Sequence, residues 1–289
     1  MTGVLVFGTT GQVATELGRA DWPDGTELVR LSRDDADLTD PAAVGAAIEA
    51  HRPDVVVNAA AYTAVDRAET EPVLAYAVNA VAVEAMAAAT RAIDAGLIHV
   101  STDYVFDGTS ADPYLPTDSP RPLGVYGRSK LAGEYAALSN SAAVVLRTSW
   151  VYSSVGNNFV KTMRRLAAER DDLGVVDDQH GCPTSAVDIA RAIVAIVANG
   201  WSVPGVYHCA APDAGTWADL AIATIDATGN TRTTVRRITT ADYPTPAPRP
   251  ANSRLDTTTL TDTYRITLRP WREALAEVSA QLDQLEGTA

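Results

Sequence analysis

Cysteine and lysine are both scarce in this chain, which has two of each among its 289 residues. Cys182 and Cys209 form no Cys-x-x-Cys motif and are too few for a disulfide framework. This argues against a disulfide-stabilised secreted domain and against a thiolate metal site. The four histidines show no metal-ligand spacing either. We therefore expect a reduced protein without a metal site.

Positively charged residues are few. The chain has 23 Lys and Arg residues and 36 Asp and Glu residues, so its formal net charge is −13 at pH 7. Nucleic acids and anionic membranes are therefore not expected as partners. The sequence also lacks an apolar run of the roughly 18 residues that a membrane-spanning helix needs. Val4–Phe7 is too short for the apolar region of a signal peptide and follows no basic segment. We expect a cytoplasmic protein.

The first half of the chain alternates short β-branched runs with Ala-rich amphipathic stretches. The expected strands are Val4–Phe7, Glu27–Leu31, Asp54–Asn58, Leu97–Ser101 and Ala143–Arg147. The expected helices lie at about 11–20, 41–51, 72–94 and 126–139. Apolar strands that alternate with helices predict an α/β fold with a doubly wound parallel sheet, covered on both faces. Its ligand crevice should lie at the carboxyl ends of the strands.

The second half is less regular. The expected helices there lie at about 157–170, 184–199, 215–229 and 270–285, with short strands near 173–177 and 205–208. Proline-rich segments at 113–122 and 244–250 interrupt this part of the chain. The segment 244–250 is either a rigid surface connection or a loop that covers a substrate.

The segment Gly8–Ala14 (GTTGQVA) follows the first expected strand directly and opens a helix. Gly8 permits a tight turn, and Gly11 lets backbone N–H groups approach a pyrophosphate at the helix N-terminus. Ala14 stands where a third Gly is usual and is small enough for close packing. The segment's position between the first expected strand and a helix predicts a dinucleotide-binding loop. We expect residues 1–150 to form an NAD(P)-binding Rossmann domain and residues 151–289 mainly a smaller substrate-binding lobe, part of which can return to the first.

The end of the second expected strand bears on the choice of cofactor. An acidic residue there accepts the ribose hydroxyls of NAD, whereas an Arg pairs with the 2′-phosphate of NADP. Here the strand ends at Ser32 and Arg33, and acids follow only at Asp34 and Asp35. This favours NADPH. NADH stays open, since Arg33 can equally be a solvated surface residue.

Two further stretches can line the same cofactor. Asp37 and Leu38, just before the next expected helix, can border the adenine. Asn58–Tyr62 (NAAAY) closes the third expected strand with small residues, which would let a cofactor lie flat over the backbone. Tight packing of the strand is the alternative explanation.

A Tyr-x-x-x-Lys motif at Tyr126 and Lys130 carries the catalytic interpretation. In a helix these two residues are at i and i+4 and share one face. An ammonium beside a phenol favours the phenolate, so we expect Lys130 to lower the pKa of Tyr126 and make it a proton donor or acceptor. Thr102, at the end of the fourth expected strand, can add a hydroxyl to this site or can simply cap its own backbone.

Several motifs together resemble the extended short-chain dehydrogenase/reductases: Gly8–Ala14, Asn58–Glu69 (NAAAYTAVDRAE), Ser101–Phe106 (STDYVF) and Tyr126–Glu134 (YGRSKLAGE). Further motifs resemble the dTDP-4-dehydrorhamnose reductase family: Arg147–Tyr152 (RTSWVY), Gly156–Met163 (GNNFVKTM), Asp178–Thr184 (DQHGCPT) and Tyr243–Leu255 (YPTPAPRPANSRL). The similarity runs from about residue 3 to about residue 275. It implies a Rossmann-type lobe with a smaller substrate lobe. It also implies that the protein catalyses the last step of dTDP-L-rhamnose synthesis, which supplies cell-wall polysaccharides.

The resemblance implies that NADPH reduces the C4 ketone of dTDP-6-deoxy-L-lyxo-4-hexulose while Tyr126 protonates the C4 oxygen. Lys130 would hold the nicotinamide ribose, and Thr102 would hydrogen-bond the reacting oxygen. The expected cofactor contacts are Gly8, Thr10, Gly11, Gln12, Val13, Ser32, Arg33, Asp37, Leu38, Ala60, Ala61, Tyr62, Thr63, Tyr126 and Lys130. The expected substrate contacts are Thr102, Asp103, Tyr104 and Trp150.

Some relatives in this family dimerise through magnesium held by glutamates. Glu16 matches one such position, but Val187 stands where a second glutamate would be expected after Pro183 and Thr184. A magnesium-bridged dimer is therefore doubtful, and both a monomer and a homodimer stay open.

Other functions also stay open. A dehydratase of this superfamily would carry Asp-Glu after the Thr, but Tyr104 follows Asp103 here, which disfavours elimination. A related nucleotide-sugar ketoreductase or epimerase is one alternative. A non-catalytic regulatory subunit that binds NADP is another, and such a protein need not keep the catalytic set. Arg249 and Arg254 can bind the diphosphate of a nucleotide-sugar or form surface ion pairs.

Overall fold

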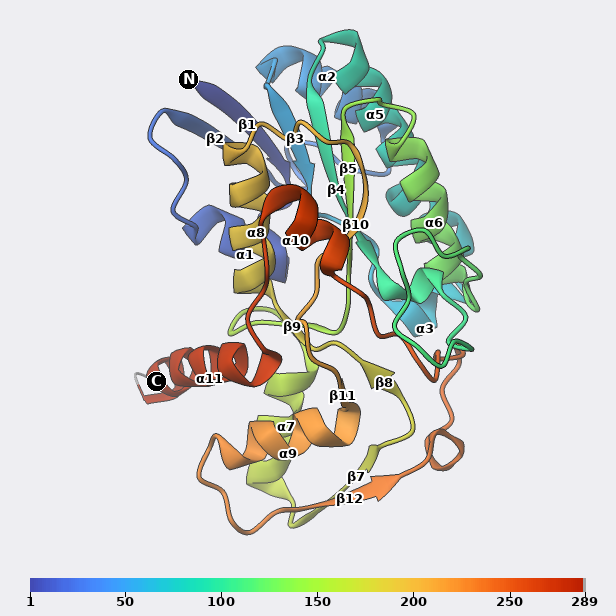
Figure 1. Cartoon of the computed structure of the whole chain (residues 1–289), viewed down its shortest axis with the longest axis vertical. Coiled ribbons are helices and arrows are strands. Elements are labelled where there is room, and N and C mark those ends of the chain that lie inside the picture. The colour runs from blue at the N-terminus through green and yellow to red at the C-terminus, as the bar shows by residue number, and fades with distance from the viewer. Residues whose placement is uncertain (288–289) are drawn as a thin grey trace.

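The computed structural model describes residues 1–287 and contains a six-stranded sheet in the order β10-β5-β4-β3-β1-β2 (Figure 1). Its strands are β1 (Thr2–Phe7), β2 (Thr26–Leu31), β3 (Val55–Asn58), β4 (Gly96–Thr102), β5 (Ala143–Thr148) and β10 (Gly205–His208). Every neighbouring pair in this sheet is parallel. The chain leaves β1 for β2 on one side and then crosses to β3 on the other, which places a switch point between β1 and β3. The predicted doubly wound sheet is confirmed.

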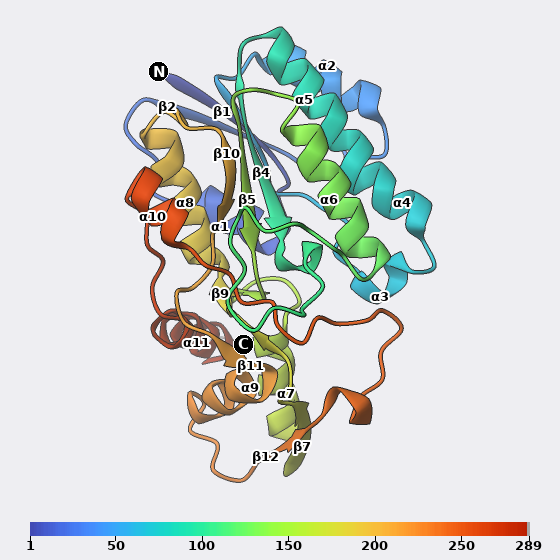
Figure 2. The ribbon, with the colours of Figure 1, turned by 45° about the vertical axis from the view of Figure 1, so that its right-hand side comes forward.

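Helices cover both faces of the sheet (Figures 1 and 2). One face carries α1 (Gln12–Arg19), α8 (Ala186–Ala198) and α10 (Thr258–Tyr264), and the other carries α2 (Pro41–His51), α5 (Ala82–Ala92) and α6 (Val125–Ala137). Successive strand residues point to opposite faces. Val4 and Val6 therefore pack in the cluster with α1 and α8, whereas Leu5 and Phe7 pack in the cluster with α2 and α5. Burial on both faces explains the continuous apolar runs in the sequence.

The stretch predicted as one helix at 72–94 consists of α4 (Pro72–Tyr76), the π-helical turn η1 (Ala77–Val81) and α5. Pro72–Ala92 is long and apolar enough to cross a membrane, the one such helix among residues 1–287. It packs on α2, α6 and the sheet, and 44% of its most apolar window is buried. Core packing accounts for the apolar residues of its buried face, such as Val83 and Met86.

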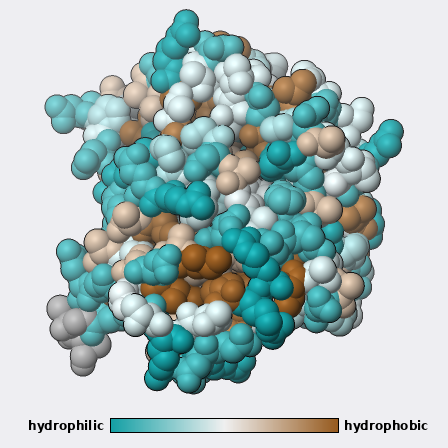
Figure 3. Space-filling model, turned by 60° about the horizontal axis from the view of Figure 1, so that its bottom comes forward, coloured by the Kyte–Doolittle hydropathy of each residue, from teal (hydrophilic) through white to brown (hydrophobic). Residues whose placement is uncertain are grey.

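The rest of the second half forms a smaller body below the sheet, built around two apolar clusters (Figure 1). Its main elements are α7 (Phe159–Glu169), α9 (Trp217–Asp226), α11 (Trp271–Gly287) and the parallel pair β7 (Asp172–Val176) and β12 (Thr234–Ile238). Seen from below, a group of apolar residues is exposed between hydrophilic ones (Figure 3).

Several short elements were not predicted. They are α3 (Val65–Ala68), α10, β6 (Val151–Tyr152), β8 (His180–Gly181), β9 (Thr184–Ser185), β11 (Gly215–Thr216), β12, η2 (Asp103–Val105) and η3 (Thr240–Asp242). Most of them have two to five residues, which is too short for a periodic pattern to appear in the sequence.

Part of the second half belongs to the upper sheet. β10 pairs with β5, α8 packs on α1, and α10 packs on β10. The chain thus moves between the sheet and the lower body more than once after residue 150. The division into a cofactor domain at 1–150 and a substrate lobe at 151–289 stays a prediction, and residues 288 and 289 lie outside the described part.

Helix α6 approaches η1 so closely that Gly133 has no room for a side chain. A Cβ atom at Gly133 would collide with the backbone carbonyl oxygen of Asn79. Gly133→Ala should therefore lower the free energy of unfolding by about 1–3 kcal/mol, measured by urea denaturation. Gly45→Ala on α2 is the matched control, because its Cβ would meet no atom within 4 Å. The control should be neutral or stabilising by up to about 1 kcal/mol, and equal losses in both variants would refute the packing argument.

Candidate active site

A cavity of about 650 Å³ lies along the carboxyl ends of the sheet strands. The loops after β1, β2 and β3 form one part of its wall, and α6 forms another. All residues predicted to contact the cofactor line it: Gly8, Thr10, Gly11, Gln12, Val13, Ser32, Arg33, Asp37, Leu38, Ala60, Ala61, Tyr62, Thr63, Tyr126 and Lys130. The fold therefore brings these separate sequence motifs together around one cleft.

The loop after β1 has the geometry of a phosphate cradle. Gly8 has a φ of 116°, and a Cβ there would lie 3.1 Å from the Ala14 Cβ atom, so glycine is required. Gly11 is the N-cap of α1, and no side chain caps this helix end. The first N–H groups of α1 thus lack a side-chain acceptor at the cleft, and a helix N-terminus favours a negative ligand. These features fit the pyrophosphate of a dinucleotide.

The loop after β2 carries Arg33 at the edge of the cleft. Its guanidinium pairs with Asp37 at 3.1 Å, and its side chain is 76% exposed. Ser32 donates to the Asp35 carboxylate through both its N–H group and its hydroxyl, at 2.8 Å and 2.7 Å. An exposed ion pair contributes little stability. Arg33 can therefore exchange Asp37 for a phosphate on a ligand at low energetic cost.

Tyr126 and Lys130 lie on one face of α6, and both are buried. Hydrogen bonding to Thr102 lowers the pKa of Tyr126, but burial has the larger effect and raises it to about 12. The prediction that Lys130 lowers this pKa is wrong. The Lys130 Nζ atom donates instead to the Val100 carbonyl at 2.7 Å and lies 3.4 Å from His99 Nε2. A phenol that keeps its proton at neutral pH is suited to act as an acid.

Thr102, Asp103 and Tyr104 surround Tyr126 and are not part of the cavity lining. Thr102 caps η2 by accepting from the Tyr104 N–H group, and its hydroxyl donates to Asp103 at 3.1 Å. Ser149 donates to the same carboxylate at 2.9 Å. Burial raises the pKa of Asp103 to about 6, against the hydrogen bonds that lower it. The Tyr104 ring meets the Tyr126 ring edge-on at 5.7 Å.

Trp150 lies against the lower body. Its ring stacks on that of Trp217, with centroids 3.6 Å apart and planes 6° apart. Its backbone has a positive φ of 46°, and Gly181 leaves room for the indole, which a Cβ there would strike. Trp217 donates to Gln179 at 3.1 Å, which fixes the ring on which Trp150 stacks.

Arg249 and Arg254, for which the sequence allowed two interpretations, both have hydrogen-bond partners within the protein. Arg249 makes two bonds to the Asp66 carboxylate, at 2.9 Å and 3.0 Å, and its guanidinium lies over the Tyr104 ring. Arg254 donates to Asn252 at 2.8 Å and to the Ala111 carbonyl. The proline-rich segment 244–250 is therefore tied to α3 through the Arg249–Asp66 ion pair.

Sequence reasoning missed several residues around the cleft. Leu74 and Val78 line it from α4 and η1, although their sequence reads only as an amphipathic helix. Asn79 exchanges hydrogen bonds with the Tyr62 backbone at 2.8 Å and 3.0 Å and so fixes the loop after β3. His99, behind Lys130, reads as an ordinary residue of a buried strand. The signal that the sequence offered for His99 was a polar residue inside an apolar run.

Glu16, the position at which the resemblance implies a magnesium ligand, already has polar partners within the chain. Glu16 accepts a hydrogen bond from Ser153 at 2.7 Å and pairs with Arg19 at 3.5 Å. Val187, where a second glutamate was expected, offers no side-chain ligand. Within residues 1–287, no group of three or more His, Cys, Asp or Glu side chains is placed to hold a metal ion.

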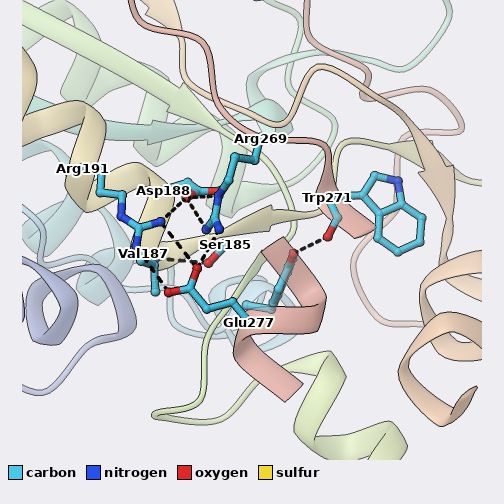
Figure 4. A network of polar contacts seen from close by, with 8 residues as sticks. Ser185, Val187, Asp188, Arg191, Arg269, Trp271 and Glu277 are labelled. Atoms are coloured by element: carbon cyan, nitrogen blue, oxygen red, sulfur yellow. Dashed lines mark hydrogen bonds and ion pairs between the residues drawn. The ribbon is translucent and has the colours of Figure 1, made fainter. Parts of the chain in front are cut away.

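The acidic residues beside Val187 are neutralised by arginines (Figure 4). Asp188 pairs with Arg269 at 2.6 Å and with Arg191 at 3.2 Å. Glu277 pairs with the same two arginines, at 2.7 Å and 3.3 Å. This network joins α8 to α11, and its carboxylates have positive partners already.

The parallel sheet, the glycine-rich loop and the Tyr126–Lys130 pair together define a reductase of the short-chain dehydrogenase/reductase type. The family model described as RmlD substrate binding domain matches residues 1–284. The chain belongs to the RmlD family of dTDP-4-dehydrorhamnose reductases. A dTDP-4-dehydrorhamnose reductase from Sinorhizobium fredii is 44% identical over 280 residues. The aligned region covers 94% of this chain and 94% of that relative.

Solved structures agree with this family. A dTDP-4-dehydrorhamnose reductase from Clostridium acetobutylicum is 36% identical and superposes with a TM-score of 0.93, covering 97% of this chain and 99% of that one. The enzyme of that name from Bacillus anthracis, solved in complex with NADP, is 32% identical with a TM-score of 0.92 and the same coverage.

Asp103 should make stability depend on pH. Its folded pKa of about 6 lies above its ordinary value of 3.8, so the folded chain holds the proton more tightly and stability falls as pH rises from about 4 to 6. Asp103→Asn removes this loss and should raise the free energy of unfolding at pH 7 by about 1–3 kcal/mol. Urea denaturation at pH 7 and at pH 4 checks this. A gain of the same size at pH 4 would exclude ionisation as its cause.

Proposed function

We propose that this protein reduces the C4 ketone of dTDP-6-deoxy-L-lyxo-4-hexulose to the alcohol of dTDP-L-rhamnose, with NADPH as reductant. Relatives at least 36% identical that match the chain over nearly its whole length, such as those from Sinorhizobium fredii and Clostridium acetobutylicum, carry the name of this reductase. The observation that carries the proposal is the position of Tyr126. The Tyr126 phenol is protonated and lies in the wall of a cleft lined by the expected dinucleotide contacts. It is hydrogen-bonded to Thr102 and lies one helical turn from Lys130.

Each residue of this set has a defined task in the reaction. Tyr126 donates its proton to the C4 oxygen of the sugar, because burial keeps the phenol protonated at neutral pH. Thr102 has one hydroxyl hydrogen, which it donates to Asp103 in the free protein. It turns this hydrogen to the reacting oxygen when substrate binds and stabilises the charge that develops there. Lys130 holds the ribose next to the reacting carbon. NADPH, when bound, supplies the hydride that adds to C4.

The cofactor assignment rests on the loops after β1 and β2. The uncapped N-terminus of α1 binds the pyrophosphate, and Arg33 meets the 2′-phosphate after it releases Asp37. The Bacillus anthracis relative in complex with NADP supports this choice. NADH is the second candidate. It has no 2′-phosphate, so it could bind while Arg33 stays paired with Asp37.

The substrate assignment is a nucleotide-sugar that enters beside Tyr126. We assign Asp103, Tyr104 and Trp150 to its sugar, with Trp150 held in place by Trp217. We also propose that the protein acts in the cytoplasm, as a monomer or a homodimer. A regulatory subunit that only binds NADP is the alternative from another class, but the kept set of Thr102, Tyr126 and Lys130 favours catalysis.

Tyr126→Phe tests the proton donor. The variant keeps the ring but loses the hydroxyl, so kcat should fall by about 100- to 10,000-fold. The assay follows the absorbance of NADPH with the enzymatically prepared 4-keto sugar nucleotide. Tyr135→Phe, on the exposed face of the same helix, is the matched control and should keep wild-type turnover. Cofactor binding without turnover in the wild type would favour the regulatory subunit.

Arg33→Ala tests the cofactor preference. Loss of the charge-assisted bond to the 2′-phosphate should raise the Kd for NADPH about tenfold. The Kd for NADH should stay the same, because NADH lacks that phosphate. Fluorescence titration of both cofactors measures this, and an equal change for both would rule out the assigned role of Arg33.

A further inference from the structure

The buried histidine His99 lies directly behind Lys130, and neither hydride nor proton transfer to the sugar requires it. It sits on β4 and has no exposed surface. Its Nδ1 atom lies 3.1 Å from the amide nitrogen of Asn58, and its Nε2 atom lies 3.4 Å from Lys130 Nζ. A chain of polar groups therefore runs through the protein from Asn58 to the lysine in the cleft.

The orientation of Asn58 decides which nitrogen of His99 carries the proton. The backbone N–H group of Ala60 donates to Asn58 Oδ1 at 3.2 Å, so the NH2 group of the amide is the part that faces His99. An amide NH2 group can only donate, and His99 Nδ1 must therefore accept. In a neutral imidazole the proton is then on Nε2, the nitrogen that faces Lys130.

The charge state of His99 follows from its surroundings. Full burial lowers its pKa well below the ordinary value, and the charge of Lys130 lowers it further. His99 is thus neutral and turns its Nε2–H group toward Lys130 Nζ. A charged lysine has three donors and no acceptor, whereas a neutral lysine can accept this N–H and still donate to the Val100 carbonyl. The contact therefore favours the neutral lysine.

The other groups around Lys130 do not cancel this effect. Glu134, on the next turn of α6, raises the pKa of Lys130. Its carboxylate is already bound by Arg147, at 2.7 Å and 2.9 Å, and by the Ser101 hydroxyl at 2.5 Å. Tyr126, one turn earlier on α6, is a neutral phenol. Burial prevails and lowers the pKa of Lys130 to about 8.

We propose that His99 is a positioning residue that promotes loss of the Lys130 proton, through the Nε2–H group that Asn58 forces toward the lysine. The functional consequence rests on the proposed reductase activity, in which charged Lys130 holds the ribose. Turnover then falls as the pH rises past the point where Lys130 loses its charge. His99 sets where on the pH scale this alkaline limit lies.

An NMR titration tests this without substrate. The full chain, labelled with ¹³C-lysine, gives side-chain signals from two lysines only, and Lys161→Arg assigns them. The Lys130 signal should titrate near pH 8 in the wild type. In His99→Gln an oxygen can accept from the ammonium, so the midpoint should rise by about one unit. Lys161 is the internal reference and should not shift between variants. An unchanged Lys130 midpoint in a folded variant overturns the proposal.

Two further measurements keep the test decisive. His208, a buried histidine on β10, bonds to the Asp256 carbonyl, so His208→Gln is the matched control and should leave the Lys130 midpoint unchanged. ¹⁵N-histidine spectra of the wild type should show His99 as the Nε2–H tautomer. An Nδ1–H tautomer or a charged imidazole overturns the proposal even if the Gln variant does not fold.

The activity profile separates this inference from the function on which it rests. In His99→Gln the alkaline limb of kcat/KM on the 4-keto sugar nucleotide should move up by the same interval as the Lys130 midpoint. A limb that stays in place while the midpoint moves refutes the catalytic consequence. Absence of wild-type turnover refutes the reductase function, while the NMR titration still decides what His99 does to Lys130.

Discussion

The ion pair between Glu134 and Arg147 fixes helix α6 on the sheet. Both side chains are almost fully buried, and three hydrogen bonds of 2.7 Å, 2.9 Å and 3.2 Å join them. The Ser101 hydroxyl binds the same carboxylate, so one contact links α6 with β4 and β5. Loss of either charge would leave the other buried without a partner. Tyr126 and Lys130, on the turns before Glu134, face the cleft because this pair sets the position of the helix.

The sheet and its cleft were predictable because their causes are local in the sequence. Each central strand is buried on both faces and reads as an apolar run, and the loops at the strand ends carry small or polar residues. Gly8 shows why this works, since a tight turn after a strand needs glycine wherever it occurs. Elements such as β8 and β11 were not predictable, because two-residue strands form only where distant parts of the chain already pack together.

The electrostatics of the site were harder to predict than its residues. The i and i+4 spacing placed Tyr126 and Lys130 on one face, but it could not show that the lysine turns toward Val100 and His99. Burial, which raises the pKa of Tyr126, depends on Tyr104 and on other segments remote from α6. Arg249 illustrates the same limit, because its partner Asp66 lies 183 positions away in the sequence.

The origin of β10 affects how the protein can be synthesised and divided. This strand comes from residues 205–208, yet it covers the edge of β5 in the main sheet. A fragment that stops at residue 150 would leave the backbone groups of an apolar strand unpaired, which favours aggregation. On the ribosome, the nascent chain cannot complete its sheet until residue 208 has emerged. The first half of the chain therefore depends on the later half to complete its sheet.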